Sequence, residues 1–321
     1  MTFSISLKAR TATTVCALFM SAWVQAELIV SHKTAGLEYP ENSIEGFRAS
    51  LAMPVNAIEL DIHVTKDKQL ILHHDPVLSS YNCFGKDSKE RLIIAQSTLK
   101  ELVSIDCQNH KVDAPYHLPS LDTVLQVYAE SDRSKDLYLE IKVWDELIEN
   151  NPLHKGLDIS MMHYPDDEVA GLVLDAVRKY DLNQNIVFNT FSRELLLTLR
   201  NKQRDDEVFR YGLLYKGDYA PWTLGIIALF TPLQCYDSCW APDYREVRRW
   251  LNQNQIDYLL PNFAQLTNFL FRRGYTRHIE DKENSFEVIP WTLNTPEQWI
   301  TYRDYNFAGI ITDTPSAYEK Q

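Results

Sequence analysis

Residues 58–75 read IELDIHVTKDKQLILHHD, and this stretch decides the fold. Two apolar runs flank the polar residues at 65–68, a pattern that predicts a β-hairpin. Glu59 and Asp61 are two positions apart, so their side chains share one face of the first strand. A chain that rises from Asp61 and then turns back arrives at His74 level with Asp61. The stretch therefore brings two carboxylates and a histidine together at one end of a strand.

The rest of the chain alternates apolar β-branched runs with segments of helical period. Helical patterns lie between most of the runs, for instance at 169–180, 193–200, 245–254 and 263–273. The apolar runs predict eight strands, at 28–31, 57–61, 137–141, 186–189, 209–214, 256–260, 287–291 and 308–312.

Eight strands with a crossover after each predict the α/β class and a (β/α)8 TIM barrel. The β-hairpin and a small insertion at 78–119 follow the second strand. An open doubly wound sheet is the alternative, but that fold usually carries a Gly-rich phosphate loop. The chain has only 10 glycines and no such loop.

Composition narrows the class of protein. The chain has 321 residues, 45% of them hydrophobic, which is enough for one large α/β domain with a substantial core. Its formal net charge is -12. We expect no nucleic-acid partner, because neutralising nucleic-acid phosphates requires clustered positive charge.

Residues 1–26 have the features of a cleaved signal peptide. Lys8 and Arg10 form a basic start, residues 11–24 are apolar and small, and small residues follow where signal peptidase cleaves. A membrane anchor is the alternative, but the apolar run is shorter than the roughly 20 residues that a span needs. We therefore expect an exported protein, periplasmic or secreted, whose barrel domain covers 27–321 without a stable membrane span.

Four cysteines remain after the predicted cleavage site: Cys83, Cys107, Cys235 and Cys239. Four cysteines allow three pairings, and we expect the local ones, Cys83 with Cys107 and Cys235 with Cys239. Disulfides persist in the oxidising compartment that an exported protein reaches. A zinc site is the alternative, but the CYDSC segment lacks a second close pair of Cys or His ligands.

Three acidic residues predict a metal site. Two inward carboxylates in a barrel, Glu59 and Asp61, repel each other unless a cation lies between them. Glu140 lies near the end of another strand, in LYLEIK at 137–142, and adds a third oxygen ligand. Three carboxylates without a thiol or paired imidazole are typical of a hard divalent cation, Ca²⁺ or Mg²⁺. A surface salt-bridged pair is the alternative, and the apolar neighbours of Glu59 and Asp61 argue against it.

Two histidines and two lysines are placed to act beside this metal. His32 follows the first strand and faces the same end of the barrel as His74. Two histidines that flank a metal suit general acid–base cleavage of a phosphodiester, one accepting a proton and the other returning one to the leaving oxygen. Lys33 and Lys142 are candidate phosphate contacts.

Nine short motifs occur in the order and spacing of one known family. They are HK at 32–33, PENS at 40–43, ELD at 59–61, TKD at 65–67, HD at 74–75, LPSL at 118–121, LEIK at 139–142, WTLN at 291–294 and GIITD at 309–313. With them the chain resembles the glycerophosphodiester phosphodiesterase (GDPD) family over nearly the whole predicted mature chain. Each motif alone is a weak signal, whereas nine in sequence order are a strong one.

The resemblance implies a TIM barrel, a divalent metal on Glu59, Asp61 and Glu140, and His32 and His74 as the acid–base pair. It also implies hydrolysis of a small-molecule glycerophosphodiester to glycerol 3-phosphate and an alcohol such as choline, ethanolamine or glycerol. In the family, a hydroxyl of the substrate attacks the phosphorus, and the metal lowers the pKa of that hydroxyl.

The chain also departs from the family pattern. Lys33 and Thr34 stand where the family usually has arginine and glycine, and lysine lacks the two-pronged contact that arginine makes with phosphate. The resemblance assigns Glu41 and Asn42 to the surroundings of the metal, although a simple turn that caps the next helix is an alternative. Trp291 is expected to stack on the substrate, and core packing is the other common role of a tryptophan.

Two other functions fit the same residues. One is phospholipase D-like or sphingomyelinase D-like cleavage of lysophospholipids, which the apolar stretch at 221–231 would suit if it touched a bilayer. The other is a non-catalytic protein that binds phosphodiesters, for which Lys33 is the supporting feature. The sequence leaves open the head group, the choice between Ca²⁺ and Mg²⁺, and the oligomeric state.

Overall fold

The structure is a computed structural model of the whole chain. It describes residues 28–85, 87–108, 115–143, 164–216, 243–263, 266, 269–280, 283–302 and 305–320.

The centre of the molecule is a sheet whose principal strands are all parallel. Its order is β10-β9-β8-β7-β6-β2-β1-β11, and every neighbouring pair in this path is parallel. The strands are β1 (Leu28–Ser31), β2 (Ala57–Val64), β6 (Asp136–Ile141), β7 (Ile186–Thr190), β8 (Arg210–Tyr215), β9 (Tyr258–Pro261), β10 (Glu287–Val288) and β11 (Gly309–Thr312).

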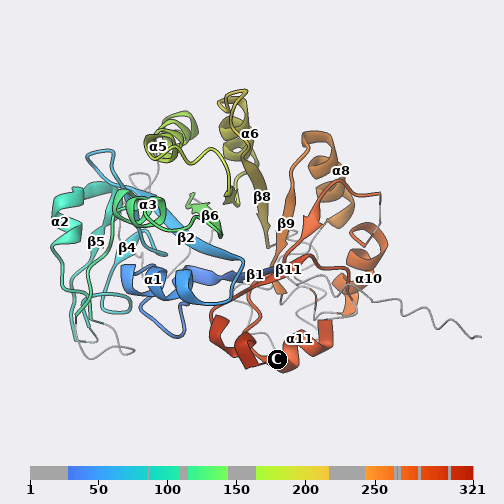
Figure 1. Cartoon of the computed structure of the whole chain (residues 1–321), viewed down its shortest axis with the longest axis horizontal. Coiled ribbons are helices and arrows are strands. Elements are labelled where there is room, and N and C mark those ends of the chain that lie inside the picture. The colour runs from blue at the N-terminus through green and yellow to red at the C-terminus, as the bar shows by residue number, and fades with distance from the viewer. Residues whose placement is uncertain are drawn as a thin grey trace, which may run out of the picture.

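The two end strands of this sheet approach each other and nearly close it into a barrel. The Ala308 amide donates to the Val288 carbonyl oxygen at 2.9 Å, and the Ile311 amide donates to the Pro290 carbonyl oxygen at 2.9 Å. Figure 1 shows the helices around the outside of the strands. This arrangement confirms the predicted (β/α)8 TIM barrel.

β10 is shorter than the predicted strand at 287–291. The regular ladder with β9 stops at Val288. Pro290 has no amide hydrogen, but its missing donor lies on the side of β11, since the alternate residues Glu287, Ile289 and Trp291 are the ones that donate toward β9. The chain nevertheless stays beside β9, because the Ile289 and Trp291 amides donate to the Leu259 and Pro261 carbonyl oxygens at 3.0 Å each.

Helices cover the outside of the barrel, and several begin at a residue whose side chain accepts an amide of the first turn. These N-caps are Ser43, Ser120, Ser192 and Asp243. The helices are α1 (Ile44–Ala52), α2 (Leu99–Val103), α3 (Leu121–Ala129), α5 (Asp166–Lys179), α6 (Arg193–Asn201), α8 (Tyr244–Asn254), α10 (Phe269–His278) and α11 (Pro296–Tyr302).

Side chains alternate along each strand between the barrel interior and the helices. On β2, Ile58 and Leu60 pack in the large cluster that joins the strands to the helices, whereas Ala57 belongs to a second cluster inside the barrel. Glu59 and Asp61 alternate with Ile58 and Leu60, so they lie on the inner face, as predicted. They stand toward the C-terminal ends of the strands, which we call the mouth of the barrel.

The predicted hairpin is present. β3 (Leu70–Leu72) pairs antiparallel with β2, with Ile62 opposite Leu72. The His73 amide donates to the Asp61 carbonyl oxygen at 3.2 Å. His73 is therefore the residue opposite Asp61, one position earlier than expected, and His74 follows it at the mouth.

A small insertion follows the hairpin and has a core of its own. It contains β4 (Val77–Leu78), β5 (Leu92–Ile93) and α2, and its buried cluster includes both Cys83 and Cys107. These cysteines form a disulfide, which confirms the first predicted pairing. The disulfide closes a loop across 24 positions of the chain and ties the two ends of the insertion together.

Some expectations lie outside the described residues. They are the signal peptide at 1–26, the apolar stretch at 221–231 and the pairing of Cys235 with Cys239. Among the helices that are described, none combines the length and the apolar character that a membrane crossing requires.

Gly46→Ala is expected to destabilise the fold. A Cβ atom at position 46 of α1 would lie 2.4 Å from the Thr34 carbonyl oxygen and 2.7 Å from Thr34 Oγ1. Overpacking of this kind costs about 1–3 kcal/mol, which outweighs the roughly 0.5–1 kcal/mol that alanine gains over glycine in a helix. Urea titration of both proteins measures the difference in the free energy of unfolding.

Gly171→Ala in α5 is the matched control, because among the described residues no atom outside the adjoining helix backbone lies within 4 Å of a Cβ at that position. It is expected to raise the free energy of unfolding by roughly 0.5–1 kcal/mol. Equal stability of the two variants would contradict this account of the contact between α1 and the loop that carries Thr34.

Candidate active site and metal centre

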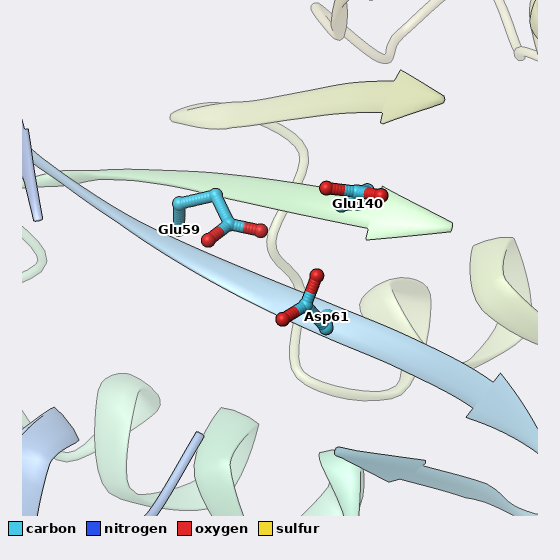
Figure 2. A group of neighbouring side chains, drawn as sticks. All are labelled: Glu59, Asp61 and Glu140. Carbon is cyan, nitrogen blue, oxygen red and sulfur yellow. The ribbon is translucent and has the colours of Figure 1, made fainter. Parts of the chain in front are cut away.

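Three carboxylates gather on the inner face of the barrel mouth. Glu59 and Asp61 come from β2 and Glu140 from β6, and in Figure 2 all three project into the same space between the strands. Asp61 and Glu140 are register partners of the two parallel strands. One oxygen atom from each residue lies within 4.8 Å of the other two, and all three residues are buried.

Asn42 fixes the orientation of Asp61. The Asn42 amide Nδ2 donates to Asp61 Oδ2 at 2.7 Å, and Asn42 Oδ1 accepts the Asp61 backbone amide at 2.9 Å. Asn42 itself is fully buried and has a left-handed backbone with φ 57°, a conformation that asparagine adopts more readily than most residues. The PEN turn therefore carries a direct contact to the acidic cluster.

Lys142 supplies a positive charge inside the cluster. Its Nζ lies 2.7 Å from Asp61 Oδ1 and 2.5 Å from Glu140 Oε1. Burial opposes the charge on Lys142, but the two carboxylates outweigh burial and raise its pKa. Burial likewise works against ionisation of Asp61, and Lys142 together with nearby histidines and Lys33 lowers the pKa of Asp61 below its ordinary value.

The negative charge of the Glu59 carboxylate is less well compensated by neighbouring groups than that of Asp61. Its Oε2 accepts the Lys33 backbone amide at 2.8 Å, while its Oε1 is buried without a hydrogen-bond partner among the described residues. Burial raises the pKa of Glu59 well above its ordinary value, and the negative charges of Asp61 and Glu140 raise it further. A buried carboxylate oxygen that lacks a partner destabilises the folded state unless a cation binds it.

His32 lies beside this cluster and is anchored from the other side. Its Nε2 is 3.9 Å from Glu59 Oε2, and its Nδ1 is 2.6 Å from Asp313 Oδ1. Asn294 Nδ2 donates to the second oxygen of Asp313 at 2.9 Å. Burial alone would raise the pKa of Asp313, but its bonds with His32 and Asn294 hold it at about 2. Asp313 is therefore a carboxylate, which favours the proton of His32 on Nδ1.

His74 lies at the rim of the mouth, and its side chain is 42% exposed compared with 13% for His32. His74 Nδ1 is 2.9 Å from Asp75 Oδ1, and Asn82 Nδ2 donates to Asp75 Oδ2 at 2.8 Å. The His74 carbonyl oxygen lies 3.2 Å from Nε2 of the buried His63. The ring and the backbone of His74 are thus both held.

Lys33 begins a loop with an unusual backbone. Lys33, Thr34 and Ala35 all have positive φ angles, 48°, 60° and 64°. The left-handed region is strained for a β-branched residue such as threonine and suits glycine. Lys33 Nζ faces Glu41 at 3.6 Å. Burial opposes its charge, but Asp61 and Glu41 raise the pKa of Lys33.

Aromatic side chains form another part of the mouth. Trp291 is half-buried, and its indole Nε1 donates to the Leu260 carbonyl oxygen at 2.8 Å. The Trp291 ring meets the ring of Phe191 edge to face, with the centroids 5.9 Å apart. Lys216 Nζ lies 5.0 Å from the centroid of Phe191. Trp291 therefore contributes to the packed wall of the mouth.

The structure brings the predicted carboxylates, histidines, lysines and PEN-turn residues together, places Trp291 in the aromatic wall of the mouth, and adds four more residues. The additional residues hold the two histidines in place: Asp75, Asn82, Asn294 and Asp313. Asp75, Asn294 and Asp313 stand in the quoted motifs HD, WTLN and GIITD, which was a signal that these positions serve the site. Asn82 lies in the insertion, where the sequence pattern indicated no functional role.

The chain matches the profile of the "Glycerophosphoryl diester phosphodiesterase family" over residues 32–317, which includes every candidate site residue. The chain belongs to this family.

Named relatives extend over most of the chain. A glycerophosphodiester phosphodiesterase of Caldanaerobacter subterraneus subsp. tengcongensis is 20% identical over 291 residues, covering 90% of this chain and 94% of the relative. The human lysophospholipase D GDPD3 is 21% identical, covering 89% of this chain and 82% of the relative. These relatives and the family profile identify the chain as a phosphoric diester hydrolase of the glycerophosphodiester phosphodiesterase type.

A solved structure shows the same fold. The Oleispira antarctica phosphodiesterase in complex with its product sn-glycerol-3-phosphate has a TM-score of 0.61 to this structure at 13% sequence identity, and the match covers 91% of this chain and 95% of that one.

The acidic cluster suits a hard divalent cation. All its candidate ligands are carboxylate oxygens, the donor type that Ca²⁺ and Mg²⁺ prefer. Glu59 Oε1 has no hydrogen-bond partner among the described residues, and the oxygens of the three residues are close enough to share one ion. Lys142 alone does not balance the three negative charges, so a cation would relieve the repulsion that raises the pKa of Glu59.

In the presence of a chelator, ionisation of Glu59 is expected to lower the free energy of unfolding as the pH rises above 4.5, the ordinary pKa of a glutamate. Folding raises the pKa of Glu59, so the folded state binds more protons than the unfolded state in this range, and stability is lost as they dissociate. Asp61 has the opposite shift and acts only below its ordinary pKa of 3.8. Burial lowers the pKa of His63 and His73, which oppose the effect of Glu59 below their ordinary pKa of 6.5, so the contribution of Glu59 is the difference from a variant that lacks its charge. Urea titrations from about pH 5 to about pH 8 measure the slope.

A saturating divalent cation should reduce this fall, because binding to the ionised cluster stabilises the folded state. Glu59→Gln is the control variant, since it keeps the shape of the side chain and removes its charge. We expect the variant to lose both the fall with pH and most of the response to the cation. Identical profiles for Glu59→Gln and the unchanged protein would contradict the assignment.

Proposed function

We propose that the chain hydrolyses glycerophosphodiesters to sn-glycerol 3-phosphate and an alcohol, with a divalent cation, Ca²⁺ or Mg²⁺, held by Glu59, Asp61 and Glu140. The observation that carries the proposal is the buried cluster of three carboxylates with a histidine 3.9 Å from Glu59. Family membership supports the reaction class, and the acidic cluster supports the cation.

When bound, the cation would supply positive charge that favours ionisation of the attacking hydroxyl and offsets the charge on the phosphate. Asn42 and Lys142 keep the carboxylates oriented toward a shared point. Lys33 and Lys142 are the proposed phosphate contacts, because both are cations at the mouth whose pKa is raised.

The proton transfers are assigned to the two histidines. The 2-hydroxyl of the glycerol moiety attacks the phosphorus, and its proton passes to Nε2 of His32. The bond between phosphorus and the alcohol oxygen breaks as Nε2 of His74 donates a proton to that oxygen. Water then opens the cyclic phosphate as the histidines exchange roles, which yields glycerol 3-phosphate and returns both protons to their starting positions.

The different surroundings of the histidines support this division of roles. His32 is mostly buried and lies next to the acidic cluster, where the attacking hydroxyl would be activated. His74 is at the exposed rim, from which an alcohol can depart. Trp291, half-buried in the wall of the mouth, is proposed to contact the part of the substrate that enters there.

A lysophospholipase D activity is the second candidate, because the human relative GDPD3 carries that name. It requires the same residues and differs in the leaving portion and in the fatty acyl chain of the substrate. Glycerol 3-phosphate from glycerophosphocholine, compared with lysophosphatidic acid from lysophosphatidylcholine, distinguishes the two activities. The first substrate is the one we expect to be preferred.

Export is proposed as well. The basic start, apolar run and small residues before position 27 support a cleaved signal peptide, and a disulfide between Cys83 and Cys107 is typical of an oxidising compartment. Mass spectrometry of the protein from the producing cells should find a mature chain that starts at Glu27 in the periplasmic or extracellular fraction. An intact N-terminus in the cytoplasmic fraction would contradict the proposal.

Purified mature protein is expected to release glycerol 3-phosphate from glycerophosphocholine in the presence of Ca²⁺ or Mg²⁺. A chelator should abolish this activity. His32→Ala should lower kcat by roughly 100- to 10,000-fold, the usual contribution of an acid–base residue. An enzyme-coupled assay of glycerol 3-phosphate measures the rate.

His117→Ala is the matched control, because His117 is 59% exposed and pairs with Asp106 at 3.5 Å in the insertion, outside the acidic cluster. It should keep the activity of the unchanged protein. Release that is insensitive to chelator and to His32→Ala would contradict the proposed site, and tight binding of glycerophosphocholine without release would indicate a binding protein.

A further inference from the structure

Each of the two site histidines stands at the end of a chain of the same three residue types. His32 contacts Asp313, which accepts from the amide of Asn294. His74 contacts Asp75, which accepts from the amide of Asn82. In both chains the aspartate binds Nδ1 through one oxygen and the asparagine through the other. Nε2 of each histidine is thus left for other partners.

Three hydrogen bonds hold the side-chain amide of Asn82 in place. Its Nδ2 donates to Asp75 Oδ2 at 2.8 Å and to the Val77 carbonyl oxygen at 3.0 Å. Its Oδ1 accepts the Ser79 backbone amide at 2.8 Å. The Asn82 amide group is therefore fixed in one orientation, with its donor side turned toward Asp75.

The backbone around Asn82 is fixed by the insertion. The next residue, Cys83, forms the disulfide with Cys107. The Gln108 amide donates to the Cys83 carbonyl oxygen at 2.8 Å, and the Tyr116 hydroxyl lies 3.4 Å from the Asn82 carbonyl oxygen. The position of Asn82 thus depends on the stapled insertion and is independent of the barrel strands that hold His32.

His74 needs such support more than His32 does. Its side chain is 42% exposed, so neighbouring atoms restrict the ring less. Asp75 is the adjacent residue, and its carboxylate can hold the ring only if the carboxylate is itself held. Burial alone would raise the pKa of Asp75, but the bonds from His74 and Asn82 outweigh burial and lower it. Asp75 is thus an anion that accepts the Nδ1 proton and leaves Nε2 to exchange protons with the substrate.

We propose that Asn82 is a positioning residue for proton donation to the leaving alcohol, acting through Asp75 on His74. The inference rests on the proposed phosphodiesterase function and assigns a role in that reaction to the insertion. The barrel supplies the cation site and His32, whereas the insertion sets the geometry of the second proton transfer.

Proton donation matters only when the leaving group is a poor one. Choline and other aliphatic alcohols leave as strongly basic alkoxides unless a proton reaches the departing oxygen. p-Nitrophenol leaves as a stable phenolate that needs no proton. A defect confined to the positioning of His74 should therefore appear with glycerophosphocholine and largely disappear with the p-nitrophenyl ester of glycerol 3-phosphate, whereas a general loss of structure would affect both substrates.

The experiment compares KM and the single-turnover rate of alcohol release for these two substrates in the full mature protein and in the variants Asn82→Ala, Asn82→Asp and His74→Ala. Alcohol release precedes the opening of the cyclic phosphate, a step that is common to both substrates and in which His74 also takes part. Asn82→Ala should lower the rate of alcohol release from glycerophosphocholine by about 10- to 100-fold, as loss of a residue that orients an active-site ligand commonly does, with KM little changed. With the p-nitrophenyl ester the loss should be no more than about threefold.

The variant Asn82→Asp helps to distinguish a loss of positioning from a loss of folding. An aspartate keeps the oxygen that accepts the Ser79 amide but turns a carboxylate toward Asp75 in place of the donor. It should be at least as defective as Asn82→Ala with glycerophosphocholine. Asn284→Ala is the matched control, because Asn284 bonds Arg248 and the Ile279 carbonyl at 2.7 Å each and precedes β10, at the opposite end of the barrel. It should lower the thermal midpoint without changing the ratio between the rates of alcohol release from the two substrates.

The outcomes separate the inference from the proposed function. Equal losses with both substrates in the Asn82 variants, beside a substrate-selective loss in His74→Ala, would overturn the role of Asn82 and leave the phosphodiesterase intact. Equal losses in His74→Ala itself would overturn His74 as the donor, and the role of Asn82 with it. Absence of turnover of both substrates by the unchanged protein would contradict the proposed function.

Discussion

The structure depends on the burial of three carboxylates at one end of the barrel. Glu59, Asp61 and Glu140 lie within reach of one ion, yet Lys142 is the only lysine or arginine in the described part of the protein that forms an ion pair with them. Repulsion between buried like charges would push neighbouring strands apart unless something compensates. Asn42 and the backbone amide of Lys33 each donate to one of these carboxylates. The loop from His32 to Ser43 is thus built around the acidic cluster.

Barrel closure couples this cluster to the far end of the chain. β1 and β11 are register partners, with Ser31 opposite Thr312. The residues that follow them, His32 and Asp313, therefore emerge side by side at the mouth and lie 2.6 Å apart at Nδ1 and Oδ1. An aspartate that is 281 positions away from the histidine becomes its partner because parallel strands of a barrel present their C-terminal ends together.

Sequence reasoning reached the fold and the centre of the site because both rest on periodicity. Glu59 and Asp61 alternate with apolar residues, so a strand must turn them to the same face. It missed the residues that hold the histidines, since Asn82 reaches Asp75 only after the insertion has folded around its disulfide. It also extended one strand to Trp291, whereas the regular pairing with β9 stops at Val288 although the chain runs on beside β9. Contacts between irregular segments leave no periodic pattern in the sequence from which they could be predicted.

The central claim is that the three carboxylates share one divalent cation. Crystals of the mature protein soaked in Mn²⁺ test it most directly, because anomalous scattering locates that ion among lighter atoms. We predict one strong peak bonded to an oxygen of each of Glu59, Asp61 and Glu140, and its loss in Asp61→Asn crystals. No peak at the barrel mouth, or a peak only at exposed carboxylates, would contradict the account.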